Sequence, residues 1–162
     1  MRNNKIATLS LLIALAMILS FVESQIPSFF AIPGIKIGLA NIAVIFALYK
    51  LSIKEAIIVS LVRVIILSFL FGTTVTLIYS LSGAILSMLV MVIMKKSNKF
   101  SEVAVSIAGG VMHNAAQIAV ACILLKSDTI KYYLPFLIVS GILTGTVIGI
   151  VSAKIIERIK IA

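Results

Sequence analysis

The chain has 162 residues, of which 62% are hydrophobic and 12% charged, and its formal net charge is +9. Its mean hydropathy of +1.26 lies far above that of soluble domains, which are about half apolar and about a quarter charged. A soluble domain of this size could not bury so much apolar surface, so the composition predicts an integral membrane protein.

Six apolar blocks are candidates for membrane spans. Crossing about 30 Å of hydrocarbon takes roughly 20 residues of helix, and lipid favours helices because it offers the backbone no hydrogen-bonding partner. Since no polar linker interrupts the chain, we expect a single transmembrane domain over residues 1–162, all-α and built as a six-helix bundle. The predicted helices are Ile6–Val22, Ile37–Leu51, Ile53–Phe71, Val75–Met94, Val103–Leu125 and Leu134–Ile156.

The first block follows Arg2 and Lys5, as the apolar part of a signal peptide would, but no small-x-small cleavage pattern comes after it. We therefore interpret it as a retained helix. Its small residues Ala7, Ser10 and Ala14 are spaced three and four apart, so they share a face that another helix could approach closely.

Two prolines and a glycine punctuate the segment after the first block, which makes it unsuited to a helix although it is apolar. Residues 27–34 form either a loop that caps the outer mouth of the bundle or an ordinary interfacial connector. The second block is the shortest, because barely a full span separates Gly34 from Lys50. We expect this helix to be tilted or to sit beside a thinner region of bilayer.

Strongly polar residues are rare in the blocks, and each costs about 2.5 to 3.5 kcal/mol at mid-depth unless it has a partner. Arg63 lies near the middle of the third block, and His113 and Gln117 share one face of the fifth. These groups fall at the midplane or in the outer half, whereas the inner half is almost purely apolar. The candidate substrate-binding residues are Lys36, Asn41, Arg63, Tyr79, His113, Asn114 and Gln117.

Two interpretations of this polar cluster stay open. It forms either a pocket that opens to the outside or a set of interhelical hydrogen bonds that hold the bundle together. The cluster is expected to carry a net positive charge, since Arg63 and Lys36 are basic, His113 can become so, and Glu23 is the only carboxylate nearby. A pocket would therefore favour an anionic or strongly accepting solute.

The sixth block carries Gly141, Gly145 and Gly149 at four-residue steps, a pattern typical of close helix packing. The pattern does not tell whether the partner helix belongs to this chain or to another one.

Basic residues predict the orientation, because cytoplasmic loops carry an excess of lysine and arginine. If the N-terminus is inside, only Lys36, Lys126 and Lys131 fall on the outer face. Both termini are therefore expected in the cytoplasm, with the chain in the cell membrane. Because the basic residues lie at helix ends, where lipid head groups and water meet them, we expect no nucleic-acid partner.

The sequence offers little for catalysis. The five acidic residues stand far apart, whereas chemistry on Mg²⁺ needs clustered carboxylates. No P-loop, HExxH or GxSxG motif occurs, and the single Cys122 excludes a disulfide or a cysteine metal cluster. We expect no enzymatic activity, no metal and no cofactor.

Two stretches resemble a known family, namely residues 33–41, PGIKIGLAN, and residues 109–117, GGVMHNAAQ. Over nearly its whole length the chain is similar to the Gx transporter family, also labelled heptaprenyl diphosphate synthase component I. That family resembles the substrate-binding S-components of energy-coupling factor (ECF) vitamin transporters, six-helix proteins of about this size.

The resemblance implies an S-component-like fold and two conflicting functions. S-components are membrane-embedded binding subunits for uptake, here of a small, anionic or polar, vitamin- or quinone-precursor-like solute. They meet a transmembrane coupling protein, which works with ATPase subunits, through small residues on the first helix, so Ala7, Ser10 and Ala14 are the candidate docking face.

The synthase label implies instead a membrane subunit of a polyprenyl diphosphate synthase. Such enzymes bind diphosphate through aspartate-rich motifs and Mg²⁺, and this chain has one aspartate. It would therefore be a non-catalytic partner of the synthase. A purely structural assembly subunit is a third possibility, favoured if no pocket exists.

Overall fold

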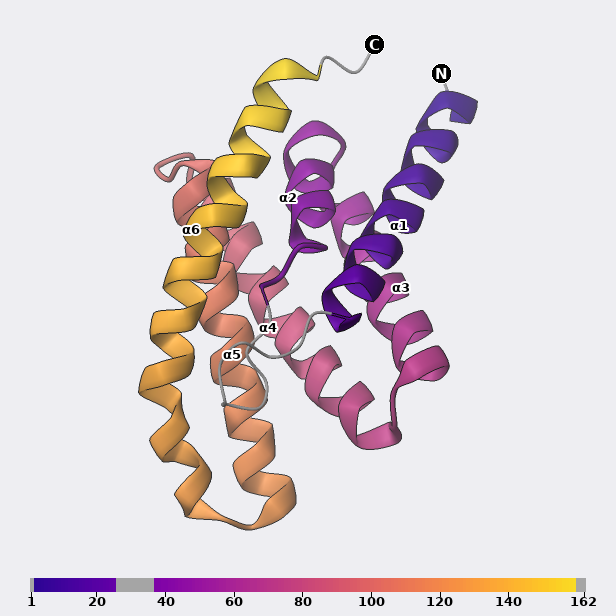
Figure 1. Ribbon diagram of the computed structural model, residues 1–162. Helices are drawn as coiled ribbons and strands as arrows, with labels where there is room; N and C mark the ends of the chain where they lie inside the picture. Colours follow the sequence, from indigo (N-terminus) through magenta and orange to yellow (C-terminus); the bar gives the residue numbers. More distant parts are fainter. Residues whose placement is uncertain (1, 26–36, 160–162) are drawn as a thin grey trace.

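The computed structural model describes residues 2–25 and 37–159, without the side chains of residues 2–4 and 128. All regular structure in these ranges is helical, which confirms the all-α prediction (Figure 1). Its elements are α1 (Arg2–Gln25), α2 (Asn41–Lys50), α3 (Ile53–Phe71), α4 (Thr74–Ser97), α5 (Glu102–Leu125), the 3-10 helix η1 (Asp128–Tyr133) and α6 (Leu134–Arg158).

Polar residues at the helix ends fix most of these boundaries. Ser52, Thr73 and Ser101 precede α3, α4 and α5, and each hydroxyl accepts a hydrogen bond from a backbone N–H of the first turn. Such caps satisfy N–H groups that have no partner inside the helix. Asn98 follows α4 with φ of 52°, a left-handed conformation that ends the helix.

The second helix is shorter than predicted, because Asn41–Lys50 replaces the expected Ile37–Leu51. Gly38 has φ of +81°, and the Glu23 carboxylate accepts hydrogen bonds from the backbone N–H groups of Gly38 at 2.6 Å and Leu39 at 3.1 Å. The chain therefore turns before it becomes helical. Ten residues of helix span about 15 Å, half of the hydrocarbon thickness.

The chain is a multi-pass membrane protein. α3 carries three charged residues within 19 and α2 is short, so the expected six spans stay a prediction. In the described part of the chain, four stretches are long and apolar enough to cross a membrane: Lys5–Gln25, Thr74–Ser97, Glu102–Leu125 and Thr129–Arg158.

The glycines of α6 face α5. A Cβ atom on Gly145 would lie 2.7 Å from the Ile107 Cα, and one on Gly149 would lie 2.8 Å from the Val103 Cα. Any side chain there would collide with backbone, so glycine lets the two helices approach this closely. The partner of the glycine run therefore belongs to this chain, which the sequence had left open.

The buried core surrounds α2. Its residues from Ala43 to Leu48 are all buried, and Leu12 and Ala16 of α1 are buried in the same apolar cluster. At the end of this helix the Lys95 ammonium donates a hydrogen bond to the Leu48 carbonyl and lies over the Tyr49 ring, 5.3 Å from its centre. This contact ties α4 to the C-terminal end of α2.

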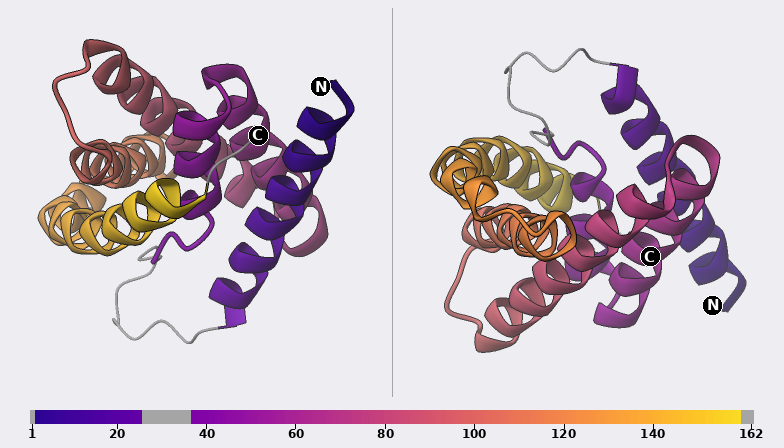
Figure 2. Two further views of the ribbon diagram at one scale, coloured as in Figure 1. Left: turned by 90° about the horizontal axis from the view of Figure 1, so that it is seen from above. Right: turned by 90° about the horizontal axis from the view of Figure 1, so that it is seen from below.

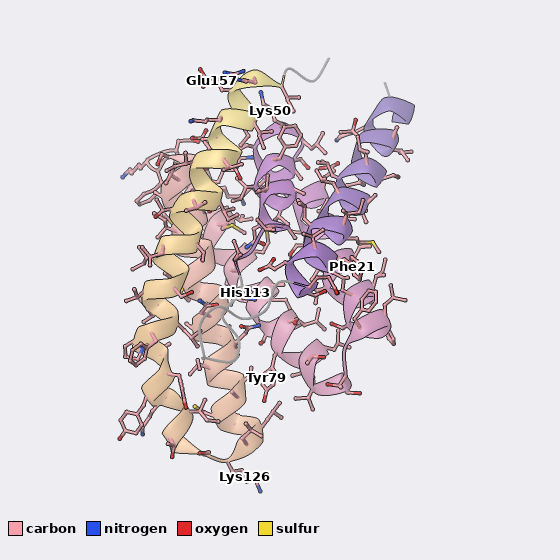
Figure 3. All side chains as sticks on the ribbon, viewed as in Figure 1. Phe21, Lys50, Tyr79, His113, Lys126 and Glu157 are labelled. Atoms are coloured by element: carbon pink, nitrogen blue, oxygen red, sulfur yellow. The ribbon has the colours of Figure 1, made fainter. Side chains whose placement is uncertain are left out.

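Both termini lie at the same end of the molecule (Figure 1). Lys50 and Glu157 lie at that end, Lys126 lies at the opposite end, and His113 lies between them (Figure 3). α1 runs along one edge and α5 with α6 along the other (Figure 2). Which end faces the cytoplasm stays a prediction from the charge bias.

Candidate functional site

A polar cavity lies where α2 begins, in the interior of the bundle. It measures about 60 Å³, and side chains from α1, α2, α3, α5 and α6 line it. The predicted residues Asn41, Arg63, His113, Asn114 and Gln117 all line this one cavity. Three helices, α2, α3 and α5, therefore bring these five side chains together.

Two predicted rim residues are not part of this cavity. Tyr79 lines a separate groove, which shares Gln117 with the cavity. Lys36 lies outside the described residues, and so does the segment 27–34 that we interpreted as a capping loop or a connector.

Arg63 brings a positive charge to the site. Its Nη1 donates a hydrogen bond to the Ser20 hydroxyl of α1 at 3.3 Å. Its Nε is buried and has no hydrogen-bonding partner among the residues that the structure describes. A buried charged N–H without an acceptor is costly, so this atom marks a place where an acceptor would be favoured.

Glu23 lines the site, although the sequence indicated it only as the carboxylate near the polar cluster and not as a binding residue. Its side chain lines the cavity with Arg63, and the two charges interact. Both carboxylate oxygens accept backbone N–H groups just before α2, where the helix dipole favours a negative charge. Two features of the sequence could have indicated this contact: a carboxylate near the end of the first apolar block and a glycine, Gly38, near the start of the second.

His113 packs against α4 at Gly83. A Cβ atom added to Gly83 would lie 2.7 to 2.9 Å from three atoms of the imidazole ring. The missing side chain of Gly83 thus leaves room for the ring. Gly83 helps to position His113, a role that the sequence did not indicate.

Asn114 is engaged in helix packing. Its Nδ2 donates a hydrogen bond to the Leu137 carbonyl of α6 at 2.7 Å, so this amide connects two helices in the way that the glue interpretation predicts. Arg63 also joins two helices through Ser20, but its Nε has no hydrogen-bonding partner among the described residues, so the choice between a pocket and interhelical hydrogen bonds stays open for this side chain.

Two further hollows adjoin the polar cavity. One measures about 250 Å³ and shares Glu23, Arg63 and His113 with it. The other is a groove of about 560 Å³ that shares Gln117 with the first cavity. Arg63 and His113 thus stand between the small cavity and a larger space lined by α1, α3 and α4.

The described residues contain no group of three or more histidine, cysteine, aspartate or glutamate side chains that could hold a metal ion. The polar groups that do converge are a guanidinium, an imidazole, amides and the Glu23 carboxylate, all suited to hydrogen bonding with a solute or with neighbouring helices.

Fold and site together define a multi-pass helical membrane protein with a buried polar cavity around an arginine. The family model described as heptaprenyl diphosphate synthase component I matches residues 12–155, and the chain belongs to this family. This confirms the family that the sequence resemblance indicated. No curated protein and no solved structure matches the chain.

Proposed function

We propose that the chain is a non-enzymatic, membrane-embedded binding subunit for the uptake of a small anionic or polar solute, in class like a vitamin or quinone precursor. It sits in the cell membrane with six spans and cytoplasmic termini. The observation that carries the proposal is the cavity in which Arg63, whose buried Nε has no hydrogen-bonding partner among the described residues, meets the polar side chains of α2 and α5.

Several features favour an anion at this place. A guanidinium presents its N–H groups in a planar fork that fits carboxylates and phosphates. The first turn of α2 borders the cavity, and the N-terminus of a broken membrane helix carries a partial positive charge. Glu23 offsets part of this charge, but backbone N–H groups already occupy both of its oxygens.

The small volume of the first cavity indicates that the binding site extends beyond it. A volume of about 60 Å³ holds only a few water molecules. The adjoining 250 Å³ also borders Arg63 and His113, so a solute held by these two side chains would extend into it.

Uptake needs a partner, because a binding subunit of this kind has no energy source of its own. We propose that a transmembrane coupling protein with ATPase subunits docks on α1. Ala7, Ser10 and Ala14 are all exposed, whereas Leu12 and Ala16 of the same helix are buried. The described part of the chain therefore leaves this small-residue face uncovered, which supports docking of a helix there.

The alternative is a non-catalytic membrane subunit of a polyprenyl diphosphate synthase, which the family's description as heptaprenyl diphosphate synthase component I favours. Co-purification with a soluble, aspartate-rich subunit, together with formation of a prenyl product, would support it over uptake.

Native mass spectrometry of protein purified without added ligand tests the binding role. We expect wild type to retain a small molecule that Arg63→Met loses, because removing one charge-assisted hydrogen bond costs about 1.5 to 3 kcal/mol, roughly a tenfold to more than hundredfold fall in affinity. Lys54→Met is the matched control, since Lys54 is exposed on the same helix.

The competing interpretation makes a different prediction. If Arg63 serves only as interhelical glue, Arg63→Met lowers the melting temperature and leaves the bound molecule and its affinity unchanged. That result would contradict the proposed function.

A further inference from the structure

The groove of about 560 Å³ differs in chemistry from the polar cavities beside it. Five of its ten lining residues are aliphatic and come from three elements: Ile118, Ala121 and Leu125 of α5, Ile130 of η1 and Leu137 of α6. Its volume falls within the range of pockets that take drug-sized ligands. Such a lining favours an apolar group over a polar one.

Three residues border both this groove and the polar cavities. Gln117 lines the groove and the cavity of about 60 Å³. Thr76 and Ser80 line the groove and the cavity of about 250 Å³, and their four-residue spacing puts them on one face of α4. A cationic region around Arg63 therefore passes into an apolar one across this border.

We propose that the solute is an anionic amphiphile, whose head group binds Arg63 beside His113 and whose single apolar chain lies in the groove between α4 and α5. The inference rests on the proposed function and names its substrate class. Arg63 supplies a charged N–H that has no acceptor among the described residues, and a phosphate or carboxylate head would accept from it. The groove supplies the apolar surface that a small polar solute would leave unused.

The position of the groove suits a ligand that first dissolves in the bilayer. Leu125 and Tyr133, which line it, are 61% and 46% exposed, so the groove opens at the surface of the bundle. The α3–α4 and α5–α6 hairpins diverge toward the end opposite the termini (Figure 1). Tyr79, another lining residue, lies between the levels of His113 and Lys126 (Figure 3).

Two probes with the same head group test the proposal, methyl phosphate and hexyl phosphate, titrated calorimetrically into protein in phosphatidylcholine nanodiscs. Each methylene that leaves water for an apolar site is worth roughly fourfold in affinity. We therefore expect wild type to bind hexyl phosphate at least about tenfold more tightly than methyl phosphate.

Substitutions test the head-group site at Arg63 and the apolar groove independently of each other. Ala121→Phe fills the groove and should remove the advantage of hexyl phosphate while methyl phosphate binds as before. Ile123→Phe is the matched control on α5, since Ile123 is 73% exposed and absent from the groove lining. If Ala121→Phe does not fold, Leu125→Gln tests the same wall at an exposed position. Arg63→Met should weaken both probes.

The outcomes distinguish this inference from the proposed function. Equal, Arg63-dependent affinities for both probes would refute the amphiphile and leave the proposed function standing. Binding that ignores Arg63 would refute both.

A second arm, with the single-chain lipid lysophosphatidylglycerol in the nanodiscs and native mass spectrometry as readout, identifies the source of the amphiphile. Retention of this lipid that requires Arg63 and an open groove would support the anionic amphiphile but assign it to the bilayer. Loss of the lipid from wild type, with hexyl phosphate bound, would support a free amphiphile.

Discussion

His113 and Gly83 illustrate how one residue depends on another across two helices. The imidazole occupies the space that a side chain on Gly83 would fill, with three ring atoms less than 3 Å from a hypothetical Cβ. The ring also borders both polar cavities. A change at Gly83 therefore acts on the site without removing any of its functional groups.

We expect Gly83→Ala to push His113 toward the cavities and to weaken ligand retention at least tenfold, as measured by native mass spectrometry. Crowding of this kind typically costs about 1 to 3 kcal/mol of stability. Gly109→Ala is the control, because its Cβ would meet the flexible Met91 thioether at 2.7 Å, away from the site. If both variants retain ligand equally, His113 does not determine binding.

Residue types alone predicted which polar side chains come together but not what each one contacts. Asn41, Arg63 and His113 could be grouped because a polar side chain in an apolar helix must face the interior of the bundle. The partner of Asn114 is the backbone carbonyl of Leu137, and every residue carries such a carbonyl. No pattern of side chains could have predicted that choice.

The helix boundaries also differ in how far the sequence predicts them: some follow from a local pattern, and others depend on a distant contact. The interval predicted for α3 agrees with the structure, because Ser52 and Gly72 delimit a continuous apolar run. α2 begins four residues later than predicted, because a carboxylate on α1 holds the chain in a turn at Gly38. That contact joins residues 15 positions apart, beyond the reach of a local pattern.

The α5–α6 pair depends on glycine at the contact. We expect Gly145→Leu to destabilise the protein by about 1 to 3 kcal/mol or more, because its side chain would meet the backbone at Ile107 and backbone cannot move aside cheaply. Thermal unfolding in detergent measures this effect. Val147→Leu is the control, since Val147 is 57% exposed on the same helix. Equal melting temperatures for Gly145→Leu and Val147→Leu would show that α5 and α6 can move apart at Gly145 without loss of stability.

The topology of the whole molecule is testable with single cysteines in a Cys122→Ala background. Ser97 is the last residue of α4 and Thr129 lies in η1, and both are exposed. The end of α4 and η1 lie at opposite ends of the molecule (Figure 1). The charge bias places Ser97 inside and Thr129 outside. We expect an impermeant maleimide to label Thr129→Cys in intact cells and to leave Ser97→Cys unlabelled. The reverse pattern would invert the orientation.

Docking of a coupling protein is a property of the whole molecule, because the solute site and the proposed docking face lie on different parts of it. Ala7, Ser10 and Ala14 lie between the second turn and the middle of α1, whereas Glu23, which borders both polar cavities, lies in its last turn. We expect Ala14→Trp to block association with a coupling complex and to leave solute binding intact, because the indole would fill the space that a partner helix needs.

Pull-down of the tagged variant with the coupling complex, run beside native mass spectrometry for the bound solute, measures both properties. Leu15→Trp is the control, since Leu15 is 41% exposed beside the stripe but is already bulky. Because Ala14 is exposed, the substitution should be tolerated by the chain itself. An Ala14→Trp protein that still captures the complex, or one that loses solute and fold together, would refute docking at this face.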